Sequence, residues 1–262
     1  FQERDRLSGG DGLLEKLRPQ QLLERLLPKP PAAVLDVGGG PGVHALRRAR
    51  RGYAVHVVDP VPLHVEQALE GSAMAEHPLA GATVGDARRL HIANERFDVA
   101  LVLGPLYHLP DRADRSAALT EAFRVLRGGG VMVAAAISRF ASAIDSLASG
   151  YIDDPRFVDI VDRGLTDGRH SNPTSNIDYF TTAFLHHPDQ LRAEVAAAGF
   201  AEVEVLAVES VGWAAPDLDE RLRDLKKRQR LLALIARVES EMSLLGASPH
   251  LLAVGRKPAP AR

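Results

Sequence analysis

The hydrophobic and polar positions follow two different periods along the first half of the chain. Leucines recur at helical spacing over residues 11–28, and the proline-rich stretch 28–31 ends that pattern. Short apolar runs then alternate with helically spaced segments, as expected for buried strands connected by helices. The predicted strands cover 34–37, 54–59, 82–86, 97–103 and 131–136, and the helices between them cover 42–51, 61–76 and 113–126. This alternation predicts a parallel sheet with right-handed crossovers.

The alternation breaks after residue 137. Residues 138–182 contain apolar helical pieces and then a polar stretch, and a segment of this length is expected to form a lid or a substrate-binding insertion. The pattern afterwards predicts a helix, a strand, a long amphipathic helix and a last strand, over 189–198, 201–208, 217–244 and 250–255. We therefore divide the chain into a core with N-terminal helices (1–137), a mainly helical cap (138–188), the rest of the core (189–256) and a frayed tail (257–262).

Composition and charge narrow the class of protein. The chain has 262 residues, a net charge of -2 and no cysteine, which excludes a disulfide framework and a thiolate metal site. The charge balance gives no general attraction to nucleic acid or to an anionic membrane. No apolar run is long enough to span a bilayer. The start is polar, lacks the apolar core of a signal peptide and lacks an initiator Met. A cytoplasmic protein with no membrane partner is the expectation.

A glycine-rich turn follows the first predicted strand, with the sequence Asp36-Val37-Gly38-Gly39-Gly40-Pro41-Gly42. Glycine allows a ligand to approach the backbone closely, and the next helix offers unpaired N–H groups to an anion. A dinucleotide-binding turn has the spacing G-x-G-x-x-G. Here the third glycine, Gly42, comes one residue early, and Val43 stands in its place. A tight turn without any ligand is the alternative.

Further candidate residues follow the next three predicted strands. Asp59 ends the second, where a carboxylate can accept both ribose hydroxyls. A helix-capping role for Asp59 is the alternative, disfavoured because Pro60 follows. Asp86-Ala87 follows the third strand, where the carboxylate can accept an adenine amino group. Leu103-Gly104 follows the fourth, at the carboxyl edge where open α/β sheets bind ligands.

These segments together resemble the class I S-adenosylmethionine-dependent methyltransferase superfamily, and within it the bacterial UbiE-like, small-molecule branch. The resemblance is carried by Val34-Leu35-Asp36-Val37-Gly38-Gly39-Gly40-Pro41-Gly42, Asp59, Gly85-Asp86-Ala87, Phe97-Asp98-Val99 and Leu126-Arg127-Gly128-Gly129-Gly130. It implies an α/β, Rossmann-like, doubly wound sheet of seven strands in the order 3-2-1-4-5-7-6, with the seventh strand antiparallel. The implied cofactor is S-adenosylmethionine, and the product is S-adenosylhomocysteine.

The resemblance also implies roles for single residues. Asp36 would hold the methionine amino group, and Gly38, Gly39 and Gly40 would lie against the methionine and ribose parts. Asp59, with Pro60 beside it, would bind the ribose. Asp86 and Ala87 would bind the adenine, and Leu103 and Gly104 would flank the amino-acid end of the cofactor.

The methyl group of this donor is already activated, so positioning is the main catalytic requirement. His108 is the candidate general base, because it follows the fourth strand and the ordinary pKa of a histidine suits neutral pH. A loop-shaping histidine bonded to the backbone is the alternative. Tyr107 is the neighbouring candidate, or an aromatic side chain packed under the lid. His186 and His187 could line the acceptor pocket or begin the following helix. Arg139 and Tyr179 are further candidate acceptor contacts. No metal signature is present in the sequence.

The acceptor class follows from the loop after the fourth strand. Methyltransferases that act on exocyclic amines of DNA bases carry Asn/Asp-Pro-Pro-Tyr there, whereas this chain has Gly104-Pro105-Leu106-Tyr107. The basic stretch 221–230 is interpreted as the solvated face of an amphipathic helix. A small-molecule acceptor without nucleic acid is therefore the prediction, with O-methylation favoured over N- or C-methylation. The oligomeric state stays open, with a homodimer as one option. A non-catalytic cofactor-binding or scaffold protein and, less favoured, a nicotinamide-dependent oxidoreductase are the alternatives.

Overall fold

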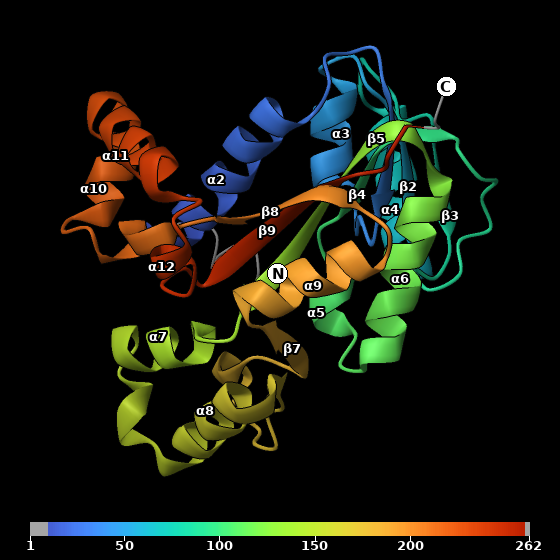
Figure 1. Ribbon diagram of the computed structural model, residues 1–262. Coiled ribbons are helices and arrows are strands. Elements are labelled where there is room, and N and C mark those ends of the chain that lie inside the picture. The colour runs from blue at the N-terminus through green and yellow to red at the C-terminus, as the bar shows by residue number, and fades with distance from the viewer. Residues whose placement is uncertain (1–9, 260–262) are drawn as a thin grey trace.

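The computed structural model describes residues 10–259, so residues 1–9 of the predicted core and residues 260–262 of the predicted tail lie outside the described residues. A twisted sheet runs through the middle of the molecule (Figure 1). Its first five strands are parallel in the order β3-β2-β1-β4-β5. Their bounds are β1 Ala33–Val37, β2 Ala54–Asp59, β3 Gly81–Val84, β4 Phe97–Val102 and β5 Leu126–Ser138.

The far side of the sheet is closed by the last strand in the sequence. β9 (His250–Arg256) lies antiparallel between β5 and β8 (Ala201–Ala207). Two short strands, β6 (Arg169–His170) and β7 (Ala183–His186), come from the insertion, and β7 pairs with the carboxyl end of β5. When the insertion strands are set aside, the order is the predicted 3-2-1-4-5-7-6 with its seventh strand antiparallel. The predicted fold class is therefore confirmed.

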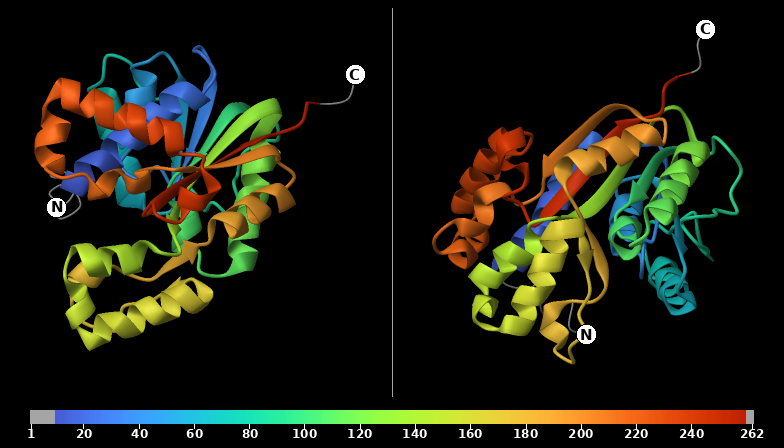
Figure 2. Two further views of the ribbon diagram at one scale, coloured as in Figure 1. Left: turned by 60° about the vertical axis from the view of Figure 1, so that its left-hand side comes forward. Right: turned by 60° about the horizontal axis from the view of Figure 1, so that its bottom comes forward.

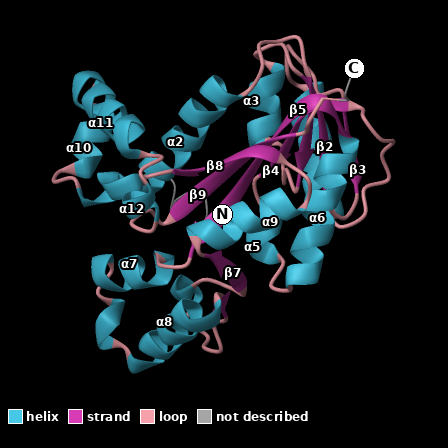
Figure 3. Ribbon diagram, viewed as in Figure 1, coloured by secondary structure: helices cyan, strands magenta, loops and turns pink. Residues whose placement is uncertain are grey.

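Helices cover both faces of the sheet (Figure 3). One face packs apolar side chains of α2, α3 and α4 against the strands, and the other packs those of α6 and α9. Burial of these two continuous apolar layers is the main force that holds the sheet and helices together. The helix bounds are α2 Gly10–Leu26, α3 Val43–Ala49, α4 Pro62–Ala73, α6 Arg112–Val125 and α9 Pro188–Ala197.

The insertion after β5 is mainly helical, as predicted. Its own small core joins Phe157, Ile160 and Tyr179, with Tyr151 packed against them. The cap lies at the carboxyl end of β5 (Figure 1 and the left-hand view of Figure 2). Its elements are α7 Ala141–Ala148, η1 Tyr151–Asp153, α8 Pro155–Asp167 and η2 Ile177–Tyr179, with β6 and β7 closing it.

The single long helix predicted over 217–244 is wrong. After η3 (Ser210–Ala214), the chain forms three helices, α10 Leu218–Arg223, α11 Leu225–Val238 and α12 Met242–Leu245. Asp224 interrupts the pattern because its side chain accepts a hydrogen bond from the backbone N–H of Lys227 and starts a new helix. Leu225, the first residue of α11, is 57% exposed and does not continue an apolar helix face from α10.

The N-terminal helix α2 is tied to this C-terminal helical region. The fully buried Arg18 donates from Nε to the carbonyl of Val208 and from Nη2 to Glu239, 221 positions away. Arg25 also pairs with Glu239. Leu14 of α2 packs among the buried side chains of α10 and α11. These contacts tie α2 to α10, to α11 and to Val208, the residue after β8.

Three smaller expectations also change. Arg127-Gly128-Gly129-Gly130 belongs to β5, where Gly129 has a φ of +82° and the register against β4 shifts. Lys257, predicted to be frayed, exchanges backbone hydrogen bonds with Gly129 and Gly130. The segment after β4 forms a short helix, α5 (Pro105–His108), instead of a loop. Within the described residues, no helix combines the length and the apolar character needed to cross a bilayer.

Candidate active site

The glycine turn connects β1 to α3 with a backbone that other residues rarely adopt. Gly38, Gly40 and Gly42 have φ values of +68°, +54° and +80°. A Cβ on Gly38 would lie 2.8 Å from side-chain atoms of Pro105, so the turn is pressed against the segment after β4. A Cβ on Gly40 would meet no atom within 4 Å. The turn therefore requires glycine for its shape and leaves open space at Gly40.

Asp36 lies beneath this turn at the end of β1. Its side chain is buried, and Oδ2 has no hydrogen-bond partner. Burial and the neighbouring Asp59 raise the pKa of Asp36 to about 7, although Arg48 opposes the shift. A buried carboxyl group without a partner is costly. A cationic group in the site would supply what Asp36 lacks, which is the fit expected for the ammonium of a bound amino-acid moiety.

Asp59 is held by local contacts at the end of β2. Its Oδ2 accepts a 2.8 Å hydrogen bond from the backbone N–H of Gly40, and its Oδ1 accepts one of 3.0 Å from Val61. His64 Nδ1 lies 3.0 Å from Oδ1. The N-cap position of α4 is occupied by Val61, so Asp59 is not the helix cap. The carboxylate instead connects the glycine turn to the start of α4, with Pro60 exposed between them.

Asp86 follows β3 and lies nearer to solvent. Arg88 donates to both of its carboxylate oxygens, with the shortest contact at 2.6 Å, and also pairs with Asp114 of α6 at 2.9 Å. The side-chain hydrogen bond from Arg88 lowers the pKa of Asp86. Ala87 is partly buried against the core. A carboxylate therefore stands just after the carboxyl end of β3, held by Arg88.

The segment after β4 approaches the glycine turn directly. A Cβ on Gly104 would lie 3.4 Å from the Gly38 carbonyl and 3.7 Å from the Tyr107 hydroxyl. Leu103 and Gly104 are half-buried, whereas the side chain of His108 is exposed. The rings of Tyr107 and His108 lie 4.6 Å apart. The structure thus brings Gly38, Gly104 and Tyr107 together, with His108 beside them.

Besides Tyr107 and His108, four further residues were predicted to contact the acceptor, and they lie in different surroundings. Tyr179 is buried in the cap core, and its hydroxyl donates to Asp154 at 2.6 Å. Arg139 donates to the Leu185 carbonyl at 2.9 Å. His187 caps α9 by accepting from a backbone N–H, which is the helix-starting alternative, and it lines a surface hollow of about 210 Å³. His186 is fully buried. Their roles toward an acceptor stay predictions.

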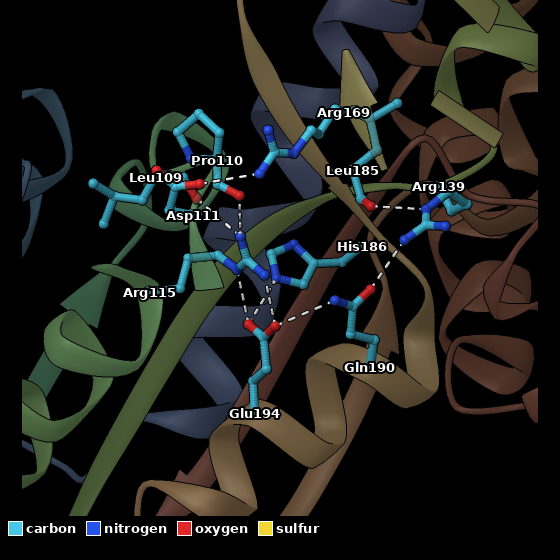
Figure 4. A network of polar contacts seen from close by, with 10 residues as sticks. All are labelled: Leu109, Pro110, Asp111, Arg115, Arg139, Arg169, Leu185, His186, Gln190 and Glu194. Atoms are coloured by element: carbon cyan, nitrogen blue, oxygen red, sulfur yellow. Dashed lines mark hydrogen bonds and ion pairs between the residues drawn. The ribbon is translucent and has the colours of Figure 1, made fainter. Parts of the chain in front are cut away.

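A buried polar network around Arg115 was missed from the sequence (Figure 4). Arg115 of α6 forms a bidentate pair with Glu194 of α9, at 2.9 and 2.7 Å. His186 Nε2 lies 3.2 Å from Glu194. Burial opposes ionisation of Glu194, but hydrogen bonds from Arg115 and His186 outweigh it and lower its pKa to about 2. Burial lowers the pKa of His186.

Helical spacing contained a signal for this network. Arg115 stands on the face of α6 that carries Ala118, Leu119 and Ala122, all buried. Glu194 shares its face of α9 with the buried Leu191. Charged residues at core positions predict buried pairing. The partner of each could not be predicted, because 79 positions separate the two residues.

The fold and this constellation define a class of protein. A sheet of this order, a glycine turn after its first strand and acidic residues at or just after the carboxyl ends of its first three strands are features of a domain that binds a nucleoside-containing cofactor. Residues 34–130 match the family model described as a methyltransferase domain. Within the part of the chain that the structure describes, no cluster of three or more His, Cys, Asp or Glu side chains could hold a metal ion.

Individual proteins agree with that match. The chain is 30% identical over 155 residues to the ubiquinone/menaquinone biosynthesis C-methyltransferase UbiE of Caulobacter vibrioides, covering 56% of this chain and 58% of that protein. It is 31% identical over 171 residues to a ubiquinone biosynthesis O-methyltransferase of Azorhizobium caulinodans, covering 64% of this chain and 58% of that protein. The chain thus spans little more than half the length of these relatives.

A solved structure extends the similarity of fold to almost the whole chain. The crystal structure of a SAM-dependent methyltransferase from Methanosarcina mazei superposes with a TM-score of 0.61 at 17% identity, covering 91% of this chain and 97% of that one. Residues 34–130 are therefore similar to a methyltransferase domain, and the chain shares the fold of a solved SAM-dependent methyltransferase.

Proposed function

We propose that this protein transfers the methyl group of S-adenosylmethionine to a small-molecule acceptor and releases S-adenosylhomocysteine. The observation that carries the proposal is Asp36, whose buried Oδ2 has no partner and lies below a turn with open space at Gly40. A carboxylate there would receive the ammonium of the cofactor. Asp59 and Asp86 would then bind the ribose and the adenine, each at the end of the next strand.

Positioning is the main catalytic device in this proposal. When bound, the cofactor supplies a methyl group that its sulfonium has already activated. The chain must hold an acceptor behind that carbon, and such orientation is worth ~7–11 kcal/mol of a barrier. Gly104 lies against the glycine turn with the Tyr107 hydroxyl beside it, and we infer that Tyr107 lines the space for the acceptor.

His108 is the proposed general base for an acceptor that carries a proton. It ends α5 beside Tyr107, and a base in this place adds about 10²–10⁴-fold to a rate. This favours an acceptor oxygen, whose proton must be removed, over nitrogen or carbon. The similar proteins named above include one O-methyltransferase and one C-methyltransferase, so similarity alone does not choose between these atoms.

Calorimetric binding tests the cofactor part of the proposal. We expect S-adenosylhomocysteine, and not NAD, to bind the wild-type protein, and Asp36→Asn to weaken that binding about tenfold or more. Gly129→Ala, in the glycine run of β5, is the matched control and should bind normally. Binding of NAD without binding of S-adenosylhomocysteine would indicate the nicotinamide-dependent alternative and overturn the proposal.

Turnover tests the catalytic part. Formation of S-adenosylhomocysteine should be detected with at least one acceptor from a panel of hydroquinols, catechols and amines. His108→Ala should lower kcat about 10²-fold on an oxygen acceptor and should flatten its pH profile. An unchanged rate at every pH would remove His108 from the mechanism. Cofactor binding without turnover on the whole panel would favour a non-catalytic protein.

A further inference from the structure

The segment that carries Tyr107 and His108 has little structure of its own. α5 is a helix of only four residues, and its N-cap position, Gly104, makes no side-chain cap. A single helical turn is not stable in isolation. Contacts from elsewhere must therefore hold α5 in place against the glycine turn.

Arg115 supplies such contacts directly behind His108. Its Nη1 donates to the Leu109 carbonyl at 3.0 Å and to the Pro110 carbonyl at 2.8 Å. The remaining donors, Nε and Nη2, engage Glu194. The Arg115 side chain is only 1% exposed, and its planar guanidinium is fixed by the bidentate pair. Both carbonyls are thus held at a set distance from α9.

The same network reaches the strand that ends the cap (Figure 4). Glu194 also contacts His186 of β7. The Phe184 ring of β7 packs against the Arg115 guanidinium, 3.5 Å from Cζ to the ring centroid. Gln190 bridges Glu194, at 3.3 Å, and Arg139, at 3.0 Å. One buried cluster therefore connects the segment after β4, helix α9 and the base of the cap.

We propose that Arg115 is a positioning residue, which sets the place of Tyr107 and His108 relative to the cofactor turn and couples that place to the cap through Glu194 and His186. This inference rests on the proposed function for its catalytic consequence. Stability alone does not account for the pair, since apolar residues of similar volume often replace a buried ion pair without loss. The guanidinium of Arg115 donates to two backbone carbonyls at once, which an apolar side chain cannot do.

Two variants separate positioning from stability. Arg115→Lys keeps a positive charge for Glu194 but cannot also bond both carbonyls. The double variant Arg115→Met/Glu194→Met removes both charges and keeps the volume apolar. The matched control is Arg169→Ala, which breaks an exposed pair with Asp111 beside the same segment. Each protein is examined by thermal unfolding, by calorimetry with S-adenosylhomocysteine, and by hydrogen exchange of the peptide over 103–111.

We expect Arg115→Lys to keep its affinity for S-adenosylhomocysteine within twofold, while exchange in 103–111 rises about tenfold. On an acceptor that the wild type methylates, kcat should fall at least tenfold with little change in the KM of the cofactor. The double variant should behave in the same way, and if it does not fold, Arg115→Lys decides by the same measurements. Unchanged exchange over 103–111 in Arg115→Lys would overturn the inference, as would an unchanged kcat. If the wild type turns over no acceptor, the proposed function fails by itself, and hydrogen exchange still decides whether Arg115 holds this segment.

Discussion

The cofactor side and the cap side of this site are built in different ways. Around the glycine turn, several polar contacts join residues close in sequence, two positions apart in Asp59–Val61 and Asp86–Arg88 and 19 positions apart in Gly40–Asp59. At the base of the cap, Arg115 and Glu194 are fully buried and 79 positions apart. The first side is thus built from turns whose residues lie closer in sequence than those of the buried pair. The second exists only after the whole fold has formed.

The largest effect on the free energy of unfolding is expected when one partner of the buried Arg115–Glu194 pair is removed. Glu194→Ala leaves the Arg115 guanidinium without its carboxylate in the interior, and we expect a loss of ~3–5 kcal/mol in the free energy of unfolding. Asp111→Ala, which removes an exposed pair with Arg169, should cost less than ~1 kcal/mol. Chemical denaturation measures both. Equal losses in the two variants would mean that the buried pair contributes no more to stability than the exposed pair.

A smaller effect is expected at the glycine turn, where it should appear in binding and not mainly in stability. Gly38→Ala places a Cβ 2.8 Å from Pro105 at a φ of +68°. We expect affinity for S-adenosylhomocysteine to fall about 10- to 100-fold, a cost of ~1.4–2.7 kcal/mol. Gly129→Ala meets a similar positive φ, +82°, with no atom within 4 Å of the new Cβ. Gly129→Ala should therefore introduce the same backbone strain while the affinity for S-adenosylhomocysteine stays unchanged.

The smallest expected effect is a pH dependence that belongs to the cofactor side alone. Because the pKa of Asp36 is raised to about 7, this group is largely protonated at pH 6 and largely ionised above pH 7. Ionising the buried Asp36 lowers the free energy of unfolding as the pH rises from the pKa of this group in the unfolded chain toward 7. A bound ammonium instead favours the ionised form. Affinity for S-adenosylhomocysteine should rise roughly tenfold from pH 6 to 7.5.

Asp36→Asn provides the control for this pH dependence. It should bind S-adenosylhomocysteine weakly and equally at pH 6 and 7.5, as measured by calorimetry in buffers of different ionisation enthalpy. A wild-type affinity that is flat over the same range would mean that Asp36 does not titrate against the ligand. Arg115→Lys leaves Asp36 in place, so its affinity for S-adenosylhomocysteine should keep the full pH dependence. This result would show that the two sides of the site act independently.

The same contrast explains what the sequence could predict. The existence of the first strands, and the placement of Asp36, Asp59 and Asp86 at or just after their carboxyl ends, follow from local apolar runs and turn residues, and the structure has them there. The strand order was implied by the superfamily resemblance and not by any local pattern. The break at Asp224 was missed because a continuous apolar stripe outweighed one capping residue. The pairing of Arg115 with Glu194 depends on how α6 and α9 pack on the sheet, and no local pattern in the chain contains that information.

β9 has a consequence for how the protein is made. It is the last strand in the sequence and pairs with both β5 and β8. Until residues 250–256 leave the ribosome, both of these strands present an open, apolar edge to other chains. The turns that are proposed to bind the cofactor follow β1 to β4 and could form earlier. A chain shortened before β9 would thus contain every proposed cofactor residue, yet we expect it to aggregate before it can bind the cofactor.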